Sequence, residues 1–194
     1  MITPHEFKEL VKSARTVRRY AQAEVIPREV LTDIVDCVRF VPSGSNQQPL
    51  KYRSVSERAE CAAVFVHLKW AATLKDWGGP VEGERPAAYI VIVADKDKSP
   101  AIDVGIAAQT MNLCARAQGI AMCMLGAINR EGIHAALRLP EDLRVQLVLA
   151  LGRPVERVVL EELPPGGATA YWRTPDGVHH VPKRALRDVL TSIV

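Results

Sequence analysis

The sequence predicts a core that mixes helices with buried strands, and three observations lead to this fold class. Residues 100–118 are almost uniformly apolar or small, and the stretch is long enough for a helix buried on most sides. Six apolar residues, 120–125, follow it directly. Residues 87–94 are equally apolar, and residues 144–151 alternate before they become fully apolar. Such runs are typical of buried strands, so a buried helix that leads into a buried strand indicates an α/β core.

The buried helix has recognisable ends. We expect the Ser99 hydroxyl to cap its first turn, with Pro100 at the first helical position, where a missing N–H costs nothing. Gly119 lies where a left-handed C-terminal cap is expected. Four polar residues interrupt the stretch, namely Asp103, Gln109, Asn112 and Arg116. The stretch also falls short of the roughly 20 apolar residues of a transmembrane helix, so we exclude a membrane-spanning role.

Composition limits the remaining possibilities. The chain has 194 residues, of which 48% are hydrophobic, so it can bury a full core, and we expect residues 1–194 to form one domain. The formal net charge is only +3, with basic residues scattered among acidic ones, which argues against a nucleic-acid partner. The four cysteines show no CxxC spacing, and no signal peptide is recognisable. Reduced cysteines and a cytoplasmic location are therefore expected.

Two amphipathic helices are predicted near the N-terminus. Thr3 and Glu6 have the spacing of a capping box, and the helix that follows carries one apolar face. We expect that face to be buried, and its residues are Phe7, Leu10, Val11 and Ala14. A second helix begins at Pro27 and ends before Pro42, because the residue before a proline is disfavoured in the helical conformation. Its apolar face contains Val30, Leu31, Ile34, Val35 and Val38.

The rest of the chain divides into short elements. A strand is predicted at 51–55 and a helix at 57–74. Glycines, prolines and charges between Lys75 and Pro86 predict a surface loop, in which Trp77 either covers a ligand or anchors the loop to the core. Asn129 is expected to cap a helix at 130–139.

The last forty residues change character. Prolines and glycines indicate an extended segment over 154–167, and Pro175-Asp176-Gly177 marks a hairpin turn. A short amphipathic helix is predicted at 185–194. Because such an extended arm has little core of its own, we expect it to pack on a partner subunit.

Two polar segments stand out as candidate binding elements. Arg15, Arg18 and Arg19 crowd the turn after the first helix, although a solvated helix end explains them equally well. The loop PSGSNQQP, residues 42–49, offers donors and acceptors without charge on a backbone restrained by two prolines. Such a loop suits the edge of an uncharged heterocycle, but an ordinary polar turn is the simpler explanation from local composition.

Several familiar chemistries are absent from the sequence. There is no GxGxxG, no GxxxxGK[ST], no GxSxG and no HExxH motif. His179 and His180 are adjacent and would point to opposite faces of a strand, so we predict no metal site. Nothing marks a protein nucleophile. An enzyme with this sequence would take its chemistry from a cofactor.

Taken together and in order, these segments resemble the FMN-dependent nitroreductase family of NAD(P)H oxidoreductases. The segment ARTVRRY at 14–20 is similar to the family's RRSxRxF turn, and PSGSNQQPL at 42–50 is similar to its PSxxNxQPW loop. The helix and strand from Asp103 to Gly126, and the strand and turn from Leu147 to Pro154, match in register. The pair Lys183-Arg184 matches the family's C-terminal basic pair. Two departures are Ala14, where the family often has arginine, and Leu50, where an aromatic is usual.

The resemblance implies an α+β fold with a mostly antiparallel central sheet, helices on both faces and an extended C-terminal arm. It also implies an obligate homodimer with two FMN sites at the subunit interface. The basic turn and the C-terminal pair would come from one subunit and the polar loop from the other.

The resemblance further implies a role for each site residue. Arg15, Thr16, Lys183 and Arg184 would hold the FMN phosphate, with more weight on the last two because of Ala14. Arg18 would lie beside flavin N1 and O2. The polar loop would bind the ribityl chain and the pyrimidine edge and pack on the ring, through Pro42, Ser43, Gly44, Asn46 and Gln48. The backbone of Leu125 and Gly126 would face the isoalloxazine.

The activity implied is ping-pong oxidoreduction. NADH or NADPH would deliver hydride to flavin N5 and leave, and a small acceptor such as a nitroaromatic, a quinone or an enone would take its place. No side chain is expected to act as a nucleophile, and the loop Lys69–Arg85 would be a lid that sets specificity. Alternatives are an FMN-binding redox sensor or carrier without turnover, a family member that destroys flavin or dehalogenates aromatics, and an interaction module without flavin.

Overall fold

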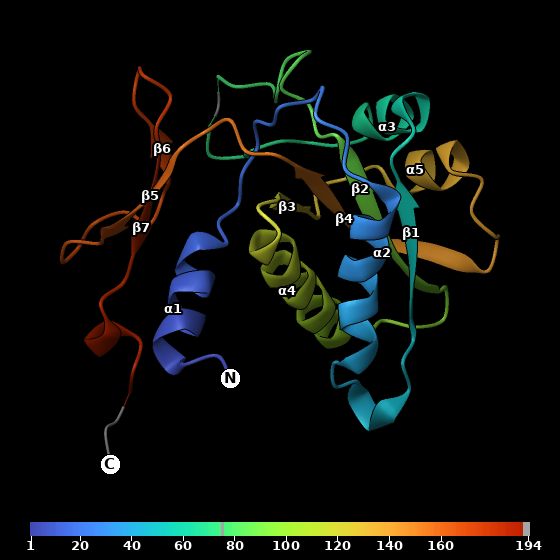
Figure 1. The fold of residues 1–194 in the computed structure, drawn as a ribbon, viewed down its shortest axis with the longest axis horizontal. Coiled ribbons are helices and arrows are strands. Elements are labelled where there is room, and N and C mark those ends of the chain that lie inside the picture. Colours follow the sequence, from blue (N-terminus) through green and yellow to red (C-terminus); the bar gives the residue numbers. More distant parts are fainter. Residues whose placement is uncertain (75, 192–194) are drawn as a thin grey trace.

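Four antiparallel strands form the central sheet of the computed structural model, which describes residues 1–74 and 76–191. Along the sheet the order is β1 (Leu50–Val55), β2 (Ala88–Asp95), β4 (Leu143–Gly152) and β3 (Ala121–Leu125). Every pairing between these neighbours is antiparallel. The sheet and its helices confirm the α+β class with an antiparallel sheet that the family resemblance implied (Figure 1).

Helices cover both faces of this sheet (Figure 1). Alternate residues of β2 point to opposite faces, so Ile90 and Ile92 pack with α2 (Arg28–Cys37) and α4 (Ala101–Ala117). Tyr89, Val91 and Val93 pack with α3 (Arg58–Phe65) and α5 (Arg130–Ala136). A sheet that is buried on both faces therefore explains the continuous apolar run of β2 in the sequence.

The central helix α4 is confirmed with altered ends and less burial than expected. Pro100 occupies the N-cap position and no side chain caps the helix, so the prediction that Ser99 caps it is wrong. Gly119 has the left-handed conformation predicted, with φ of 73°. One side of α4 packs on the sheet, but Ile102 is 81% exposed, so the helix is not buried on most sides.

The strand that follows α4, β3, is the edge strand of the sheet and leaves Met124 exposed. The prediction that this strand is buried on both faces is therefore wrong.

The first helix, α1 (Pro4–Ser13), begins with the predicted capping box. Thr3 Oγ1 accepts the Glu6 N–H at 3.2 Å, and the Glu6 carboxylate accepts the Thr3 N–H at 2.7 Å. The apolar face predicted to be buried is covered only in part, because Ala14 is buried and Leu10 and Val11 are half-buried, whereas Phe7 is 48% exposed. The helix α2 ends in a 3-10 turn, η1 (Val38–Phe40), before Pro42 as predicted.

Three predicted helices are shorter than expected. The helix at 57–74 ends at Phe65, because Leu68 pairs with Ile128 and the Lys69 N–H donates to the Ala127 carbonyl at 3.0 Å. The helix capped by Asn129 ends at Ala136. The one predicted at 185–194 is reduced to a single turn, η3 (Leu186–Asp188), and its last residues, 192–194, lie outside the described residues.

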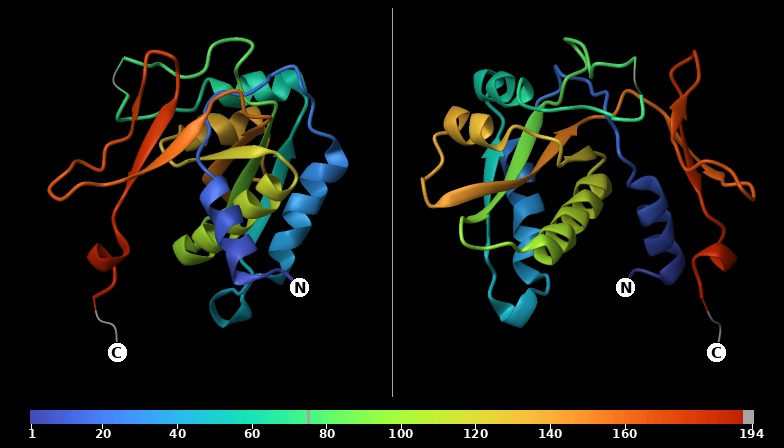
Figure 2. Two further views of the ribbon diagram at one scale, coloured as in Figure 1. Left: turned by 60° about the vertical axis from the view of Figure 1, so that its left-hand side comes forward. Right: turned by 180° about the vertical axis from the view of Figure 1, so that it is seen from behind.

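The C-terminal segment forms a second, small sheet beside α1 and apart from the central sheet (Figure 2). Its strands are β5 (Val158–Glu162), β6 (Trp172–Arg173) and β7 (His179–Lys183), in the order β5-β7-β6. The hairpin predicted at 175–177 joins β6 to β7. The strand β5 was expected only as extended chain, and it pairs with β7 in parallel. Among the described residues, no helix is long and apolar enough to cross a membrane.

Candidate functional site

The basic turn, residues 14–20, lies along the outer edge of β3. Thr16 pairs with Met122, and the Val17 N–H donates to the Met122 carbonyl at 3.2 Å. Tyr20 is fully buried at the end of the turn and rests on Gly152, where an added Cβ would lie 2.7 Å from the Tyr20 ring. The glycine at the end of β4 is therefore needed for the turn to lie against the sheet.

Ala14 begins the basic turn and faces inward. Its side chain is buried, and its carbonyl accepts a hydrogen bond from Asn112 Nδ2 at 3.3 Å. Asn112 was among the polar residues that interrupt the central helix, and the structure shows that it ties α4 to this turn. A long charged side chain at position 14 would displace this contact or leave the core.

Arg15 is a partly buried cation without an acidic partner in the part of the chain that the structure describes. Its Nη2 donates to the Val11 carbonyl at 2.9 Å, whereas its Nε is buried and has no hydrogen-bond partner. Burial lowers the pKa of Arg15, because the charged form loses hydration there. Thr16 beside it is exposed. An anion at this position would satisfy Arg15.

Arg18 is buried beneath the C-terminal sheet of its own chain and is only 9% exposed. Its guanidinium lies 4.7 Å from the centre of the Tyr171 ring, and its Nη1 lies 3.3 Å from His179 Nε2. Burial, followed by repulsion from Arg18 and Arg173, lowers the pKa of His179 to about 4. His179 is therefore neutral at pH 7, so Nε2 can accept a hydrogen bond from Arg18, while Nδ1 has no partner among the described residues.

A buried ion pair holds this sheet to the basic turn. Arg173 Nη2 donates to Glu156 Oε2 at 2.6 Å, and the Glu156 side chain is completely buried. The other carboxylate oxygen accepts the backbone N–H of Arg18. Arg173 also lies over the Trp77 ring, 4.2 Å from its centre, so Trp77 anchors the loop Lys69–Arg85. Sequence reasoning missed Glu156, Arg173 and Tyr171, because only the fold brings them to the basic turn.

The polar loop has an unusual backbone. Ser45, Asn46 and Gln48 have φ angles of 49°, 54° and 47°, a region that residues other than glycine seldom adopt. Ser43 Oγ accepts the Gln48 N–H at 2.9 Å, and the Asp103 carboxylate accepts the Gly44 N–H at 3.0 Å. Three residues at strained positions indicate that the loop conformation serves a function. A small cavity of about 170 Å³ beneath it is lined by Pro42, Ser43 and Gln48.

The structure brings some predicted site residues together and separates others. The basic turn pairs with β3 at Met122, and the same strand ends at Leu125, which is buried, before the exposed Gly126. Lys183 and Arg184 are exposed at the end of β7, and the described residues record no ion pair for either. The polar loop lies at the other end of α2 and α4 from the basic turn (Figures 1 and 2). One chain alone therefore does not assemble the whole predicted site.

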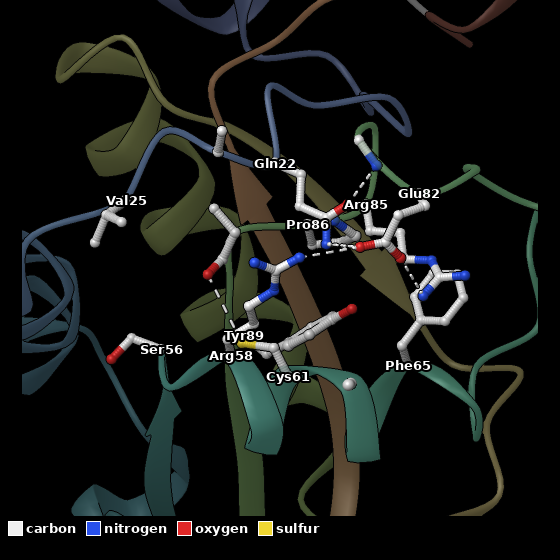
Figure 3. A pocket seen from close by; sticks show the side chains of 14 residues that line it. Gln22, Val25, Ser56, Arg58, Cys61, Phe65, Glu82, Arg85, Pro86 and Tyr89 are labelled. Atoms are coloured by element: carbon white, nitrogen blue, oxygen red, sulfur yellow. Dashed lines mark hydrogen bonds and ion pairs between the residues drawn. The ribbon is translucent and has the colours of Figure 1, made fainter.

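A further cavity of about 380 Å³ lies between α3 and the start of β2 (Figure 3). Cys61 and Tyr89 line its floor, and Arg58 and Arg85 both pair with Glu82 at its mouth. Burial raises the pKa of the Cys61 thiol to about 11, so this thiol is protonated at neutral pH. None of the site residues predicted from the sequence lines this cavity.

Comparisons with known proteins identify relatives of this chain. The profile of the nitroreductase family matches residues 11–153, which contain both the basic turn and the polar loop. A Bacillus subtilis protein, YdgI, whose name assigns it provisionally as an NAD(P)H nitroreductase, is 24% identical over 89% of this chain and all of its own.

Solved structures show the same fold. A nitroreductase family protein from Clostridium novyi NT is 25% identical, with a TM-score of 0.64 over 77% of this chain and 86% of that one. A Clostridium difficile R20291 structure called an FMN-dependent nitroreductase is 21% identical, with a TM-score of 0.61 over 76% of this chain and 87% of that one. The chain belongs to the nitroreductase family, because the family profile covers most of its length.

The neutral His179 makes stability depend on pH. In the unfolded chain a histidine titrates at about 6.5, so between that pH and about 4 only the unfolded state takes up the proton. The free energy of unfolding therefore falls as the pH drops through this window, by up to about 3 kcal/mol. Urea unfolding at pH 7 and pH 4.5 measures the loss.

The His179→Asn variant should lose less stability than the natural protein between these two pH values. The control variant His5→Asn, at an exposed site, should lose as much as the natural protein. Equal losses in all three proteins would contradict the assignment.

Proposed function

We propose that this nitroreductase-family protein is an FMN-dependent oxidoreductase, in which hydride from NADH or NADPH reaches a small acceptor such as a nitroaromatic, a quinone or an enone. The observation that carries the proposal is that Arg15 and Arg18, on the basic turn at the edge of β3, have no acidic side chain paired with their guanidinium groups among the described residues, within the region that the family profile matches. The relatives named as an NAD(P)H nitroreductase and an FMN-dependent nitroreductase support both the reductant and the cofactor.

The cations fit a phosphate group. Arg15 has a buried Nε without a partner, and Lys183 and Arg184 are exposed cations for which the described residues give no acidic partner. A phosphate monoester carries about two negative charges at neutral pH and offers three acceptor oxygens. Arginine suits such a group because its planar fork can donate two parallel hydrogen bonds. We assign the phosphate to Arg15, Lys183 and Arg184, with the Thr16 hydroxyl as an additional donor.

Arg18 retains donors for the flavin. A guanidinium has five N–H groups, and in the described structure only Nη1 of Arg18 contacts a protein acceptor. Glu156 fixes the backbone at this point, and His179 and Tyr171 hold the side chain in place. A buried, positioned cation favours negative charge on whatever lies beside it. We assign Arg18 to the flavin N1 and O2 edge.

The polar loop and the backbone after β3 suit the ribityl chain and the flavin ring, which are the uncharged parts of FMN. Ser43, Asn46 and Gln48 present hydroxyl and amide groups on a strained loop, next to Pro42. An added Cβ at Gly44 would meet nothing within 4 Å, so the space beside this backbone is open within one chain. The exposed backbone at Gly126, after Leu125, is assigned to the flavin ring.

A second copy of the chain would complete the site. The polar loop and the basic turn lie at opposite ends of the helices α2 and α4 within one chain. A polar loop from a partner subunit is therefore needed beside the cations. Apolar side chains remain uncovered on this side of the molecule, including Phe7 on α1, Phe40 after α2 and Ile102 on α4. Covering them would remove apolar area from water, which favours association. We therefore propose a cytoplasmic homodimer, with each chain acting as one domain.

The protein's part in the reaction is binding and electrostatics. Bound FMN supplies the hydride-accepting and hydride-donating chemistry. The cations hold the phosphate, the polar loop fixes the ring edge, and Arg18 supplies a positive charge. The loop Lys69–Arg85, anchored by Trp77, borders the basic turn through the Arg19–Glu84 ion pair and is the segment we expect to select the acceptor.

The visible spectrum of the purified protein tests the proposal. We expect a yellow protein that releases about one FMN per chain on denaturation and oxidises NADH or NADPH continuously when a quinone is added. A protein that binds FMN without turnover would be a sensor or carrier. A colourless protein that cannot be reconstituted with FMN would refute the cofactor assignment.

Loss of both C-terminal cations should release FMN. The Lys183→Ala/Arg184→Ala variant loses two charge-assisted contacts, so its Kd for FMN should rise by about 100-fold or more. Flavin fluorescence during titration of the apoprotein measures this change. Arg187→Ala, which removes an exposed cation nearby, should leave the Kd unchanged. Full FMN retention in the double variant would exclude the clamp.

Loss of the Arg18 charge should slow reduction of the flavin. In Arg18→Ala the flavin potential should fall, and the rate of reduction by NAD(P)H should drop on the order of 100-fold. Stopped-flow absorbance under anaerobic conditions gives the rate, and a redox titration gives the potential. Arg18→Lys keeps the charge and should retain most of both. Identical potentials in all three proteins would remove Arg18 from its assigned role.

A further inference from the structure

Two cysteines that are far apart in the sequence meet between α2 and α4. Cys37 is the last residue of α2, and Cys114 lies near the C-terminal end of α4. Their sulfur atoms are 3.0 Å apart, and both side chains are partly exposed. Neither residue is among those assigned to the cofactor. We propose that Cys37 and Cys114 form a reversible intramolecular disulfide, which makes this pair a redox modification site.

The geometry requires only a small movement. A disulfide has a bond length of about 2.05 Å, so the sulfurs need to approach by about 1 Å. Side-chain rotation can supply this, because each cysteine has a single χ angle and partial access to solvent. The two helices already pack against each other through residues of one core cluster, including Leu31, Ile34 and Met111. The backbones are therefore held at a fixed distance before the bond forms.

The other two cysteines are unsuitable for the same reaction. Cys61 and Cys123 are buried, whereas both members of the pair are partly exposed. Acidity does not distinguish them, because burial raises the pKa of Cys114 to about 11, as it does for Cys61 and Cys123. Each donates only a weak hydrogen bond to backbone carbonyls, and within the described residues neither contacts another sulfur. These two thiols provide an internal control, because an oxidant that acts without selectivity would modify them to the same extent as the pair.

The reaction balances with a small disulfide as the oxidant. One thiolate of the pair attacks the oxidant, forms a mixed disulfide and releases one small thiol. The second thiolate then attacks the protein sulfur of that mixed disulfide and releases the second small thiol. Two protons leave the cysteines, two electrons reduce the oxidant, and one S–S bond forms while another breaks. A dithiol reductant reverses the sequence.

Closing this bond would join the segment before the polar loop to the central helix. Six residues separate Cys37 from Gly44, whose N–H donates to Asp103 near the start of α4. The disulfide and this hydrogen bond would attach the same segment to α4 at two points. Cross-linking residues 37 and 114 also restricts the unfolded chain, so the oxidised protein should unfold about 10 °C higher than the reduced protein.

Peptide mapping tests the pairing directly, because trypsin places each cysteine in its own peptide. Cys37 lies in 29–39 and Cys114 in 99–116, whereas the other two lie in 59–69 and 117–130. The reduced full-length protein is incubated with oxidised glutathione at pH 8.5, alkylated and digested. We expect the 29–39 peptide to be linked to 99–116, two thiols instead of four in the denatured protein, and reversal by dithiothreitol.

Matched variants complete the test. Cys61→Ser/Cys123→Ser should still form the bond, whereas Cys37→Ser and Cys114→Ser should each keep three free thiols or carry one glutathione. Four unreacted thiols, a glutathione adduct on the natural protein that does not close, a link to another cysteine, or a disulfide between two chains on a non-reducing gel would each overturn the proposal. Because the readout is a mass and a thiol count, the result is independent of whether the protein binds FMN.

Discussion

The burial of β2 and β4 on both faces is the constraint on which the structure depends. A strand with apolar residues at nearly every position presents an apolar surface on both faces, so both faces of the sheet must be covered. The covers are α2 and α4 on one side and α3 and α5 on the other. With both faces occupied, polar functional groups can gather only at the sheet edges and the helix ends. The basic turn lies on the β3 edge, and the polar loop lies where α2 ends.

This arrangement explains why the predicted site is divided. The two ends of the α2–α4 layer carry different chemistry, with cations at one end and uncharged donors and acceptors at the other. Neither end is a complete site for a molecule that has both a phosphate and a heterocycle. The apolar residues left uncovered on α1 and α4, Phe7 and Ile102, lie in the same layer. One association of two chains could cover these residues and bring the two kinds of polar group together.

Much of the fold could be predicted from local pattern, and the errors have a common physical cause. Continuous apolar runs located β2, β3 and β4, and capping residues located the starts of α1 and α5. The predicted helix at 57–74 failed because pairing of Leu68 with Ile128 is a long-range interaction that local propensity does not contain. The predicted burial of the α1 face is only partly correct for the same reason, since amphipathic spacing marks an apolar face without stating what covers it.

The candidate site shows the same limit. Composition marks Arg15, Arg18 and the polar loop as candidates, and only the family resemblance assigns them to one site. Glu156 and Arg173 were not found, because an acid and an arginine seventeen residues apart on an irregular segment leave no periodic signal. Glu156 and Arg173 meet only in the folded chain, so the sequence alone does not indicate that they pair. The strained backbone at Ser45, Asn46 and Gln48 was equally invisible, because none of these residues is glycine.

The buried cluster of Arg18, Arg173, Glu156 and His179 carries an excess of positive charge. Glu156 is already engaged by Arg173 and by the Arg18 backbone, so its single negative charge does not neutralise both arginines. His179 cannot remove the imbalance, because it is uncharged at neutral pH and only accepts a hydrogen bond from Arg18. With Arg15 adjacent along the turn, this region holds a positive charge at a cost in desolvation. A ligand with negative charge or electron-rich edges would offset that cost, which is the physical basis of the cofactor site that we propose.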